Sequence, residues 1–359
     1  MEILKQKMSQ FQQICISRID RIGDLIISTP AIKAIRSNWP NSKITLLASS
    51  INSKVLKNSK LIDEIIIIKH EDSLIKKIKI LRTIQKRKYD LFINFSPTNL
   101  SYFLCLFSFA NKKGVIIYLS RYKKYFSKLF HRLILQLTCD YVDIINRQLL
   151  FKTKKDMHQS QMMLNLIEKI SKKSFRDIEI QIPVNSVLEG KIKNVFTKKI
   201  ITIHLSRRWI NKYYNINNFN ELINKLLQKN QYVFFLTTEK ENDENFIEIT
   251  KKFRPLELNG LNEENTKNLK TTNNNVFILD NYKYSDWISV IKQSKHIITP
   301  ESGCTHIAAA FKVPVTVIYN SDNAPDYIHK EYGPWKSIHH KLIFSDSCNI
   351  NDEINNHLD

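Results

Sequence analysis

Short runs of apolar residues alternate along the chain with stretches in which apolar residues recur every three or four positions. A short apolar run bounded by polar or turn residues is typical of a buried strand, whereas the wider spacing is typical of a helix with one buried face. In the first half, strands are predicted at 14–19, 44–48, 64–68, 91–95 and 115–118, and helices most clearly at 25–35, 74–87 and 158–172. This alternation indicates βαβ units and a parallel sheet. No clear period covers 120–156, which we expect to be helix and loop at the surface.

The same alternation returns after residue 200. Segment 173–199 mixes charges with Pro183 and Gly190 and is expected to be a linker. Beyond it, strands are predicted at 200–204, 232–237, 276–279, 296–299 and 315–319, and helices at 216–227, 241–252, 284–293 and 304–311. The prediction is an α/β protein with two Rossmann-like, doubly wound domains facing a central cleft, where ligands bind beyond the carboxyl ends of the strands. The domains are expected at 1–185 and 186–335, followed by a C-terminal tail at 336–359.

Length and composition narrow the class of protein. The chain has 359 residues, 43% of them hydrophobic, which is enough for two domains with large cores. Its six glycines lie far apart, so no glycine-rich loop can approach a pyrophosphate, which argues against P-loop NTPases and NAD-type dehydrogenases. The five cysteines lack the spacing of a zinc knuckle and are too sparse for a disulfide framework, so we expect a reducing compartment. The first residues, MEILKQKMSQFQQ, lack the apolar segment of a signal peptide, so export is not expected.

The longest apolar stretch is 102–110 (YFLCLFSFA). It is too short to cross a bilayer, because a membrane-spanning helix needs about 20 residues. Two interpretations stay open for this stretch, a buried helix and a contact with a membrane surface.

The net charge of +21 is unevenly distributed along the chain. Residues 1–200 contain 37 Lys and Arg against 15 Asp and Glu, whereas residues 201–359 contain 18 against 19. This asymmetry indicates an anionic partner for the first half, such as nucleic acid, an anionic lipid surface or an acidic substrate. A general bias toward Lys, Asn and Ile is the alternative, but the second half shares the Asn and Ile bias without the charge.

The first predicted strand ends in the loop 18–24 (RIDRIGD), which leads directly into a helix. Gly23 is expected to let the turn be tight, and Asp24 is expected at or near the amino end of the helix. There the carboxylate could simply accept hydrogen bonds from free N–H groups. Alternatively, it could point into the cleft and accept a proton from a substrate hydroxyl.

Two strand ends in the second half carry groups suited to phosphate. The block 297–310 (IITPESGCTHIAAA) places Gly303 at the start of a helix whose free N–H groups and dipole would attract an anion. His306 could line that site or pack in the core. Segment 204–214 (HLSRRWINKYY) combines hydroxyl, guanidinium and ammonium groups that suit a diphosphate, although an isolated basic loop is more often plain surface.

In this order and spacing, the three segments resemble the lipopolysaccharide heptosyltransferase family of glycosyltransferases. Arg18, Gly23, Asp24, Pro30, Ala31 and Ile32 match the pattern R-x4-G-D-x-[LIV]-x3-P-A-[LIV]. Residues 301–310 (ESGCTHIAAA) are similar to D-[ST]-G-x2-H-[LI]-A-A-A. Weaker similarities occur at 89–94 (YDLFIN), His158, 212–214 (KYY) and 332–335 (YGPW), so the resemblance covers about 14–336.

The resemblance implies a GT-B fold with the acceptor site in the first domain and the nucleotide-sugar site in the second. It also implies transfer of a heptose from an ADP-sugar to the inner core of lipopolysaccharide, with inversion at the anomeric carbon and without a metal or other cofactor. Asp24 is then the expected general base, beside an acceptor-side loop containing Arg18, Arg21 and Gly23. The expected donor-binding residues are Ser206, Arg207, Lys212, Glu241, Glu301, Ser302, Gly303 and His306.

Three segments of the sequence depart from the family pattern. Glu301 replaces an Asp, so its carboxylate reaches one methylene farther and could change which donor sugar is recognised. Thr237 and Thr238 occupy a strand end where glycines are common, which leaves Glu241 and Glu244 as alternative ribose contacts. Tyr213 and Tyr214 replace the usual Arg-Trp.

The expected partners are a nucleotide sugar, an acidic lipid-linked oligosaccharide and the inner-membrane surface, which places the enzyme in the cytoplasm as a peripheral protein. The alternatives are a related transferase for another nucleotide sugar and a non-catalytic protein that binds membrane or nucleic acid. Nucleic acid is not expected, because no such motif is present and the basic residues do not form one stripe with interleaved aromatics. The stretch between Arg121 and Arg132 is the exception, because basic and aromatic residues alternate there, and it could contact lipid.

Overall fold

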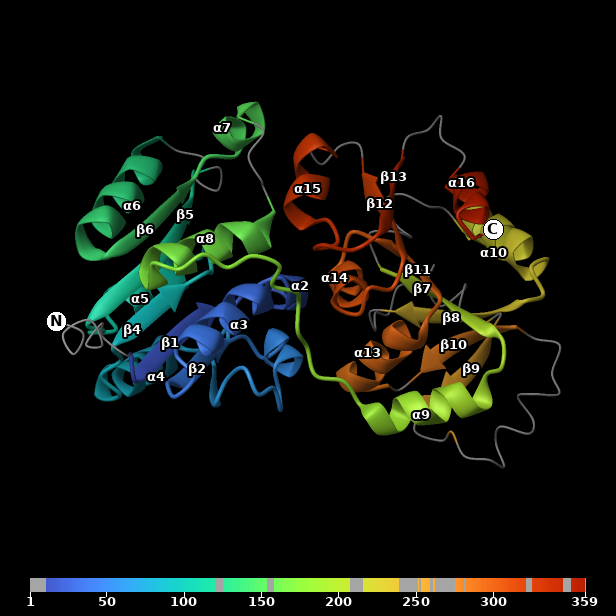
Figure 1. Cartoon of the computed structure of the whole chain (residues 1–359), viewed down its shortest axis with the longest axis horizontal. Coiled ribbons are helices and arrows are strands. Elements are labelled where there is room, and N and C mark those ends of the chain that lie inside the picture. Colours follow the sequence, from blue (N-terminus) through green and yellow to red (C-terminus); the bar gives the residue numbers. More distant parts are fainter. Residues whose placement is uncertain are drawn as a thin grey trace. The chain divides into compact units, whose positions relative to one another are not determined.

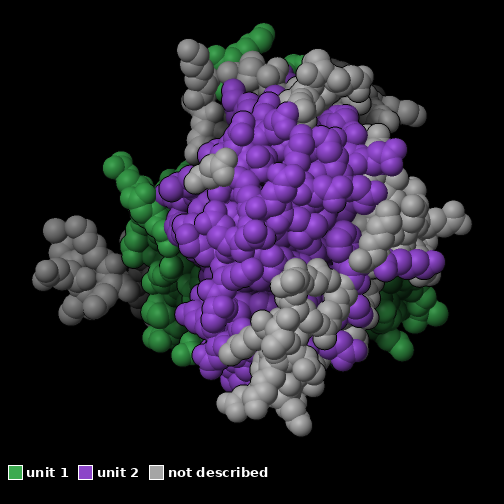
Figure 2. Space-filling view, turned by 90° about the vertical axis from the view of Figure 1, so that its right-hand side faces the viewer, with its two compact units in different colours: residues 1–183 green, residues 184–359 purple. Residues whose placement is uncertain are grey.

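The computed structural model divides the chain into two compact units. Unit 1 is Met1–Pro183 and unit 2 is Val184–Asp359, drawn green and purple in Figure 2. This division lies close to the boundary expected after residue 185. The structure describes residues 11–119, 125–153, 158–206, 216–238, 251, 253–258, 261, 275–280, 282–320, 325–344 and 350–358.

Unit 1 is built on a six-stranded sheet in the order β3-β2-β1-β4-β5-β6, in which every pairing is parallel. The strands are β1 (Gln13–Arg18), β2 (Lys43–Ala48), β3 (Glu64–Ile67), β4 (Leu91–Asn94), β5 (Lys112–Tyr118) and β6 (Tyr141–Ile145). From β1 the chain proceeds outward to β2 and β3, and then returns to β4 on the other side of β1. The switch point of this doubly wound sheet therefore lies between β1 and β4, where such sheets bind ligands.

Helices cover both faces of this sheet (Figure 1). They are α2 (Ile22–Ile26), α3 (Thr29–Asn38), α4 (Leu74–Lys86), α5 (Asn99–Leu106), α6 (Tyr125–Thr138), α7 (Arg147–Lys152) and α8 (Gln159–Ser171), with a short 3-10 helix η1 (Asn52–Val55). Helices α3 and α8 pack on each other. Helices α4, α5 and α6 share one buried cluster with the strands, through side chains such as Ile84, Tyr102 and Leu135 packed near Phe92 and Val115.

Two segments of unit 1 differ from expectation. The helical pattern expected over 25–35, in which Thr29 and Pro30 were a possible cap and first turn, forms two helices, α2 and α3, and the second begins at Thr29. Pro30 explains the break, because its nitrogen carries no hydrogen for the bond that a continuous helix would need. Strand β6 lies inside 120–156, where only helix and loop were expected. It is an edge strand whose side chains are mostly half-buried, so it lacks the apolar signal of a buried strand.

Unit 2 contains a seven-stranded sheet in the order β13-β12-β11-β7-β8-β10-β9, again with parallel pairings throughout. The strands are β7 (Lys199–Leu205), β8 (Tyr232–Thr238), β9 (Arg254–Glu257), β10 (Val276–Asp280), β11 (His296–Pro300), β12 (Val315–Asn320) and β13 (His339–Phe344). The helices are α9 (Ser186–Val195), α10 (Ile216–Leu227), α13 (Tyr284–Gln293), α14 (Gly303–Ala310), α15 (Pro325–Tyr332) and α16 (Ile350–Asn356). The switch point of this sheet lies between β7 and β11.

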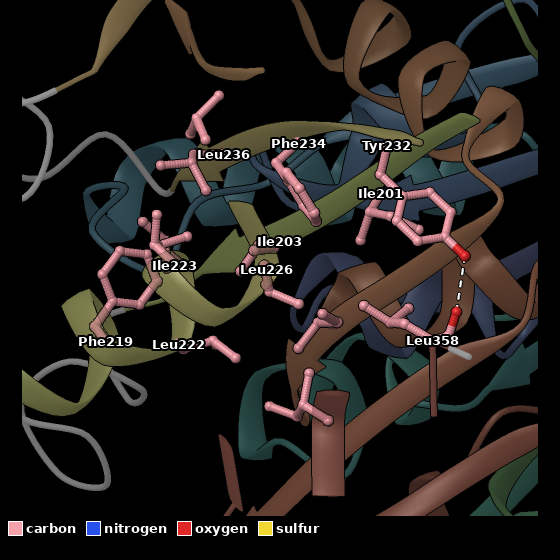
Figure 3. Close-up of a cluster of buried hydrophobic side chains, with 14 of the residues drawn as sticks. Ile201, Ile203, Phe219, Leu222, Ile223, Leu226, Tyr232, Phe234, Leu236 and Leu358 are labelled. Carbon is pink, nitrogen blue, oxygen red and sulfur yellow. Dashed lines mark hydrogen bonds between the residues drawn. The ribbon is translucent and has the colours of Figure 1, made fainter. Parts of the chain in front are cut away.

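The end of the chain belongs to the core of unit 2, which corrects the expectation of a tail at 336–359. Strand β13 pairs with β12, and the side chains of Ile350, Ile354 and Leu358 lie in one buried cluster with β7, β8 and α10. Figure 3 shows the Tyr232 hydroxyl donating to the carbonyl oxygen of Leu358 at 2.7 Å. Short, polar-interrupted segments of this kind give no long apolar period, so their packing was not visible in the sequence.

The apolar stretch 102–110 forms most of α5 and the turn after it. Tyr102, Leu104 and Cys105 are buried, as a buried helix requires, but Phe103, Phe107 and Phe109 are exposed. The buried side chains therefore support the interpretation as a buried helix, whereas the exposed phenylalanines leave the interpretation as a membrane-surface contact open. Within the described part of the chain, no helix is long and apolar enough to cross a membrane.

Candidate functional site

The loop after β1 lies at the switch point of unit 1 and is tied to the end of β4. Arg18, the last residue of β1, donates from Nη1 to the carbonyl oxygen of Phe95, and the backbone N–H of Ile19 donates to Ser96 Oγ at 2.7 Å. Because β1 and β4 are neighbours, these contacts fix the loop against both strands that flank the switch point. The start of the loop is therefore held in a defined place.

Arg18 is only 2% exposed and gathers two carboxylates at this loop. Its Nη2 lies 3.1 Å from Asp24 Oδ1, and its Nη1 lies 3.3 Å from Asp20 Oδ2. Its Nε also donates to the backbone carbonyl oxygen of Asp24 at 3.2 Å. A planar guanidinium can make several such contacts at once, so it fixes the direction of the Asp24 side chain as well as its charge.

For Asp24, the structure shows the capping role, whereas the role as a general base stays a prediction. Asp24 is the third residue of α2, and its Oδ2 accepts a hydrogen bond from the Arg21 N–H at 3.3 Å, as a capping carboxylate does. At the same time its side chain is 18% exposed, so the carboxylate is accessible to a substrate as well as anchored. Arg21 is exposed at the start of the helix.

Gly23 does not have the role expected of it. It lies inside α2, where its carbonyl oxygen accepts from Ile27 N at 3.0 Å, and no glycine among the described residues has a positive φ. The tight turn is made by non-glycine residues instead.

Three polar residues that complete this loop were not predicted. Asn52 donates from Nδ2 to the carbonyl oxygens of Arg18 at 2.9 Å and Asp20 at 3.2 Å. Ser96 holds Ile19, and Asn94 Oδ1 accepts from Ser96 N at 3.1 Å. The sequence carries a signal for two of them, since Asn94 and Ser96 are polar residues directly at the end of an apolar strand. Asn52 has no such signal, because only the fold brings η1 beneath the loop.

In unit 2, the predicted phosphate-binding block lies at the switch point between β7 and β11. Strand β11 ends at Pro300, and Gly303 is the first residue of α14, as expected. Ser302 caps this helix, because its Oγ accepts from the Cys304 N–H at 3.2 Å and lies 3.1 Å from Thr299 Oγ1. The helix therefore begins directly beyond the strand ends, with the amino end of its dipole at the position that suits an anion.

Glu301 and His306 occupy different depths at this site. His306 is buried in α14, whereas Glu301 is half-buried in the loop that precedes the helix. The backbone N–H of Glu301 donates to the carbonyl oxygen of Ile318 at 3.2 Å, which ties the loop to β12. Burial, with a smaller contribution from the Glu301 charge, raises the pKa of the neighbouring Tyr319 hydroxyl above its usual range.

Ser206 follows β7, and unit 2 contains further buried polar side chains that the sequence did not single out. Ser206 Oγ, the Tyr284 hydroxyl and Trp287 Nε1 are buried and have no hydrogen-bond partner among the described residues. The ring of His204 lies against Trp287 with centroids 5.0 Å apart, and its Nδ1 lies 3.0 Å from Thr237 Oγ1. Burial lowers the pKa of His204 to about 4, so this ring is neutral near pH 7. Unsatisfied buried polar groups cost free energy, and a polar ligand that supplies partners relieves that cost.

Several predicted residues lie outside the described part of the chain. These are Arg207, Lys212, Glu241 and its alternative Glu244, together with Arg121. The structure brings together Ser206, Glu301, Ser302, Gly303 and His306 at adjacent strand ends of unit 2, and Arg18, Arg21, Gly23 and Asp24 at those of unit 1.

A surface cavity in unit 2 is separate from this site. It has a volume of about 250 Å³ and is lined by Lys193, Lys198, Lys199 and Lys295, with Phe196 among the apolar residues. Lys199 begins β7 and Lys295 precedes β11, so the cavity lies at the amino ends of strands whose carboxyl ends carry Ser206 and Glu301.

The described residues contain no group of three or more His, Cys, Asp and Glu side chains placed to hold a metal ion. The expectation of metal-independent chemistry thus stays a prediction.

Comparison with known proteins gives the family and the fold. The model of glycosyltransferase family 9 (heptosyltransferase) matches residues 77–352. A glycosyl transferase family 9 structure from Veillonella parvula is 16% identical, with a TM-score of 0.69 over 96% of this chain and 91% of that one. The E. coli ADP-heptose lps heptosyltransferase II is 14% identical, with a TM-score of 0.68 over 97% and 98% of the two chains. The E. coli heptosyltransferase WaaC with ADP is also 14% identical, with a TM-score of 0.64 over 97% and 99%.

No curated protein matches the chain by sequence. The solved structures confirm the predicted GT-B fold, since they share both parallel-sheet units over nearly the whole chain. The family match begins at residue 77, so it includes the α14 block but not the Asp24 loop. Because that match covers well over half of the sequence, the chain belongs to glycosyltransferase family 9, the heptosyltransferases, and is a glycosyltransferase.

Proposed function

We propose that this protein transfers a heptose from ADP-heptose to a hydroxyl of the inner core of lipopolysaccharide, with inversion at the anomeric carbon. Family membership supports a sugar transferase, and the polar loops at the two switch points supply groups that suit the acceptor and the donor. The enzyme is proposed to work without a metal or other cofactor, in the cytoplasm at the inner face of the membrane. Nucleic acid is not among its proposed partners.

On the acceptor side, Asp24 is the proposed general base. The acceptor oxygen attacks the anomeric carbon, and its proton passes to the Asp24 carboxylate as the new carbon–oxygen bond forms. The bond from that carbon to the diphosphate breaks with its electron pair, which leaves with ADP. Arg18 supports this role because its contacts through Nη2 and Nε hold the carboxylate in one orientation while leaving it partly exposed.

On the donor side, negative charge grows on the departing diphosphate. The free N–H groups at the start of α14, with Ser302 and Gly303, are proposed to stabilise that charge. Ser206 Oγ and His306 are proposed to line the same pocket. Arg207 and Lys212 are proposed diphosphate contacts, and Glu241 a ribose contact, from the family resemblance. Glu301 is proposed to contact the sugar, and its extra methylene is the feature on which the alternative, a related transferase for another nucleotide sugar, would depend.

The charge of unit 1 supports an acidic acceptor. Residues 1–183 contain 33 Lys and Arg against 14 Asp and Glu, whereas residues 184–359 contain 22 against 20. A phosphorylated glycolipid would be attracted to the basic unit, because opposite charges raise the rate of encounter between partners.

The observation that carries the proposal is the Arg18-held, partly exposed Asp24 at the unit 1 switch point, and Asp24→Asn tests it. Transfer to purified acceptor should fall about 100-fold or more, because general base catalysis typically contributes that much, while binding of ADP should be unchanged. The matched control is Asp20→Asn, since Asp20 contacts the same guanidinium at 3.3 Å. If both variants lost activity equally, the loss would reflect the charge environment of Arg18 and the base assignment would be wrong.

The donor is tested on the unaltered protein. ADP-heptose should raise the temperature of thermal unfolding, because a ligand that binds only the folded state stabilises it, while UDP- and GDP-sugars should not. A shift with only a UDP- or GDP-sugar would identify a related transferase, and a lack of any shift would contradict the proposed activity.

A further inference from the structure

Helices α4, α5 and α6 form one layer of unit 1 whose outer surface is unusually apolar. They cover the same face of the sheet, because buried side chains from all three lie in one cluster with the strands. Figure 1 shows their labels one below another on the left of unit 1. The large apolar side chains exposed on this layer are Leu74, Ile75, Ile78, Phe103, Phe107, Phe109, Leu133 and Leu137. A folded domain does not normally leave so many of them in water without a partner.

The exposed apolar side chains of α5 and α6 lie at one end of the layer, whereas those of α4 lie in its amino-terminal half. The Phe103 and Phe107 rings have centroids 4.7 Å apart, and Gln85 of α4 donates to the Phe107 carbonyl oxygen at 2.8 Å. The thiol of Cys139, just after α6, is hydrogen-bonded to that of Cys105 in α5. The carboxyl ends of the three helices therefore meet. Phe109 is 69% exposed and Leu137 is 84% exposed at this end.

The same layer is strongly basic. From residue 71 to residue 140, which spans the layer with β4 and β5, the sequence contains 14 Lys and Arg against four Asp and Glu. Two of these acids form ion pairs, Asp72 with Lys76 and Asp140 with Lys112. Helix α4 alone contributes Lys76, Lys77, Lys79, Arg82 and Lys86 and no acid. Asp90 lies outside these helices, directly before β4, where its Oδ2 accepts from the backbone N–H groups of Gln12 at 2.8 Å and Gln13 at 2.9 Å.

We propose that the outer surface of α4, α5 and α6 is a docking surface for an anionic phospholipid bilayer. Lysines and arginines would lie at the level of the lipid phosphates, while the phenylalanine and leucine side chains enter the boundary between headgroups and acyl chains. Lys79, Arg82 and Lys86 are exposed on α4, the helix that also exposes Ile75 and Ile78, so both kinds of group face outward from one element.

The chemistry of this surface favours a bilayer over other partners. An interface with another protein is usually depleted in lysine, whereas this one is rich in it. An interface with nucleic acid is polar and gains little from exposed leucine and phenylalanine. Because the helices cover a face of the sheet and Asp24 lies beyond the ends of its strands, docking through this layer leaves the loop after β1 accessible.

The test is co-sedimentation of the full chain with vesicles of phosphatidylcholine alone or with added phosphatidylglycerol. Binding should require the anionic lipid and should weaken strongly in high salt, which screens charges. Lys79→Gln/Arg82→Gln/Lys86→Gln should weaken binding roughly 100-fold, because each basic residue contributes about a factor of five at such a surface. The matched control is Lys193→Gln/Lys199→Gln/Lys295→Gln, which removes the same charge from the unit 2 cavity and should bind as the parent does.

The apolar part of the surface has its own variant, Phe103→Gln/Phe109→Asn/Leu137→Gln. Asn is chosen at 109 because the backbone there has a φ of 56°, which Asn tolerates well. Binding to anionic vesicles should fall about tenfold or more, since interfacial affinity scales with buried apolar area. Unchanged thermal unfolding of both unit 1 variants would show that the fold is intact.

Several results would overturn the proposal. They are equal binding to neutral vesicles, equal loss in the unit 2 control, and full binding by both unit 1 variants. Two further results are self-association of the parent that the apolar variant abolishes, and binding of random nucleic acid but not of vesicles. The proposal does not depend on the donor or acceptor chemistry, because vesicle binding and ADP binding are measured separately. A failure here would remove support for the proposed position at the membrane but would leave the proposed transfer reaction untouched, and a failure of the transfer reaction would leave vesicle binding untouched.

Discussion

Arg18 shows how one buried side chain can organise a whole loop. Its guanidinium is almost wholly enclosed, yet it contacts Asp20, Asp24 and the Phe95 carbonyl oxygen, so its donors have partners in the loop after β1, in α2 and directly after β4. A buried charge is tolerated only when it is paired and hydrogen-bonded, and here the pairing also orients the carboxylate proposed to act as base.

At the residue scale, two buried histidines predict how stability depends on pH. Burial lowers the pKa of both His204 and His296 to about 4. An unfolded histidine has a pKa of about 6.5, so below that pH the unfolded chain binds protons that the folded chain does not. The free energy of unfolding should therefore fall between about pH 6.5 and about pH 4, by up to roughly 3 kcal/mol for each histidine, and should not change from this cause above pH 7.

His296→Gln separates this effect from acid denaturation in general. Its Nε2 lies 2.8 Å from Thr316 Oγ1, and a glutamine amide can replace that contact without becoming charged. Urea unfolding at neutral and acidic pH should show a smaller pH dependence in this variant than in the parent. The exposed His339→Gln is the control. A variant with the full pH dependence of the parent would show that His296 does not contribute.

At the element scale, helix boundaries decide where the polar loops lie. Pro30 separates α2 from α3, so the short α2 carries Asp24 on its own, close to the end of β1. Ser302 caps α14, so that helix begins immediately after β11. In both units a strand passes into a helix within a few residues, and this short connection places the helix start at the switch point.

Two helix-associated glycines should respond in opposite ways to the same substitution. Gly190 lies inside α9, where an added Cβ would meet nothing within 4 Å, so Gly190→Ala should stabilise the protein by roughly 0.5–1 kcal/mol through helix propensity. At Gly333, just after α15, an added Cβ would lie 2.5 Å from the His329 carbonyl oxygen. Gly333→Ala should destabilise by about 1–3 kcal/mol because the backbone must shift. Urea unfolding measures both, and the same sign for the two variants would contradict the packing described at these positions.

At the scale of the whole molecule, the two units differ in charge but each has its own core. Unit 1 carries nearly all of the excess positive charge, while unit 2 is almost neutral. Their buried clusters are composed of separate residues. This independence means that damage to one core should be detectable in that unit first.

A chain ending at Phe344 tests this independence. It lacks α16 and therefore loses Ile350, Ile354 and Leu358 from the unit 2 cluster, each worth about 1.5–3 kcal/mol of burial. Hydrogen exchange should become faster in β7 and β8 and stay unchanged in β1 and β4. The internal comparison with unit 1 serves as the control, and equal loss of protection in both units would show that they unfold together.

Much of the fold was predictable because local patterns there agree with the tertiary structure. The buried strands β1, β2, β7 and β8 have dense apolar runs, and α10 and α13 have one clear apolar face. Their positions therefore follow from the spacing of apolar residues along the chain alone. Edge strands such as β6 and β13 were missed because most of their side chains are only half-buried in β6, and half of them are exposed in β13. Among the candidate site residues, the sequence predicted that Asp24, Ser302 and Gly303 lie at the starts of helices, because they follow apolar strands in recognisable patterns.

By itself the sequence determined the alternation of strands and helices, the two-unit organisation, the basic first half and the family. These depend on spacing and composition, which are properties of the chain before it folds. The tertiary structure alone decided that Arg18, Asn52 and Ser96 meet around one loop, because these residues are far apart along the chain and are joined only by the order of the strands. It also decided that Phe103, Phe107 and Phe109 face outward from a stretch as apolar as a core helix. Which side of a helix is buried depends on the sheet that it packs against, and the pattern of a uniformly apolar segment cannot indicate that side.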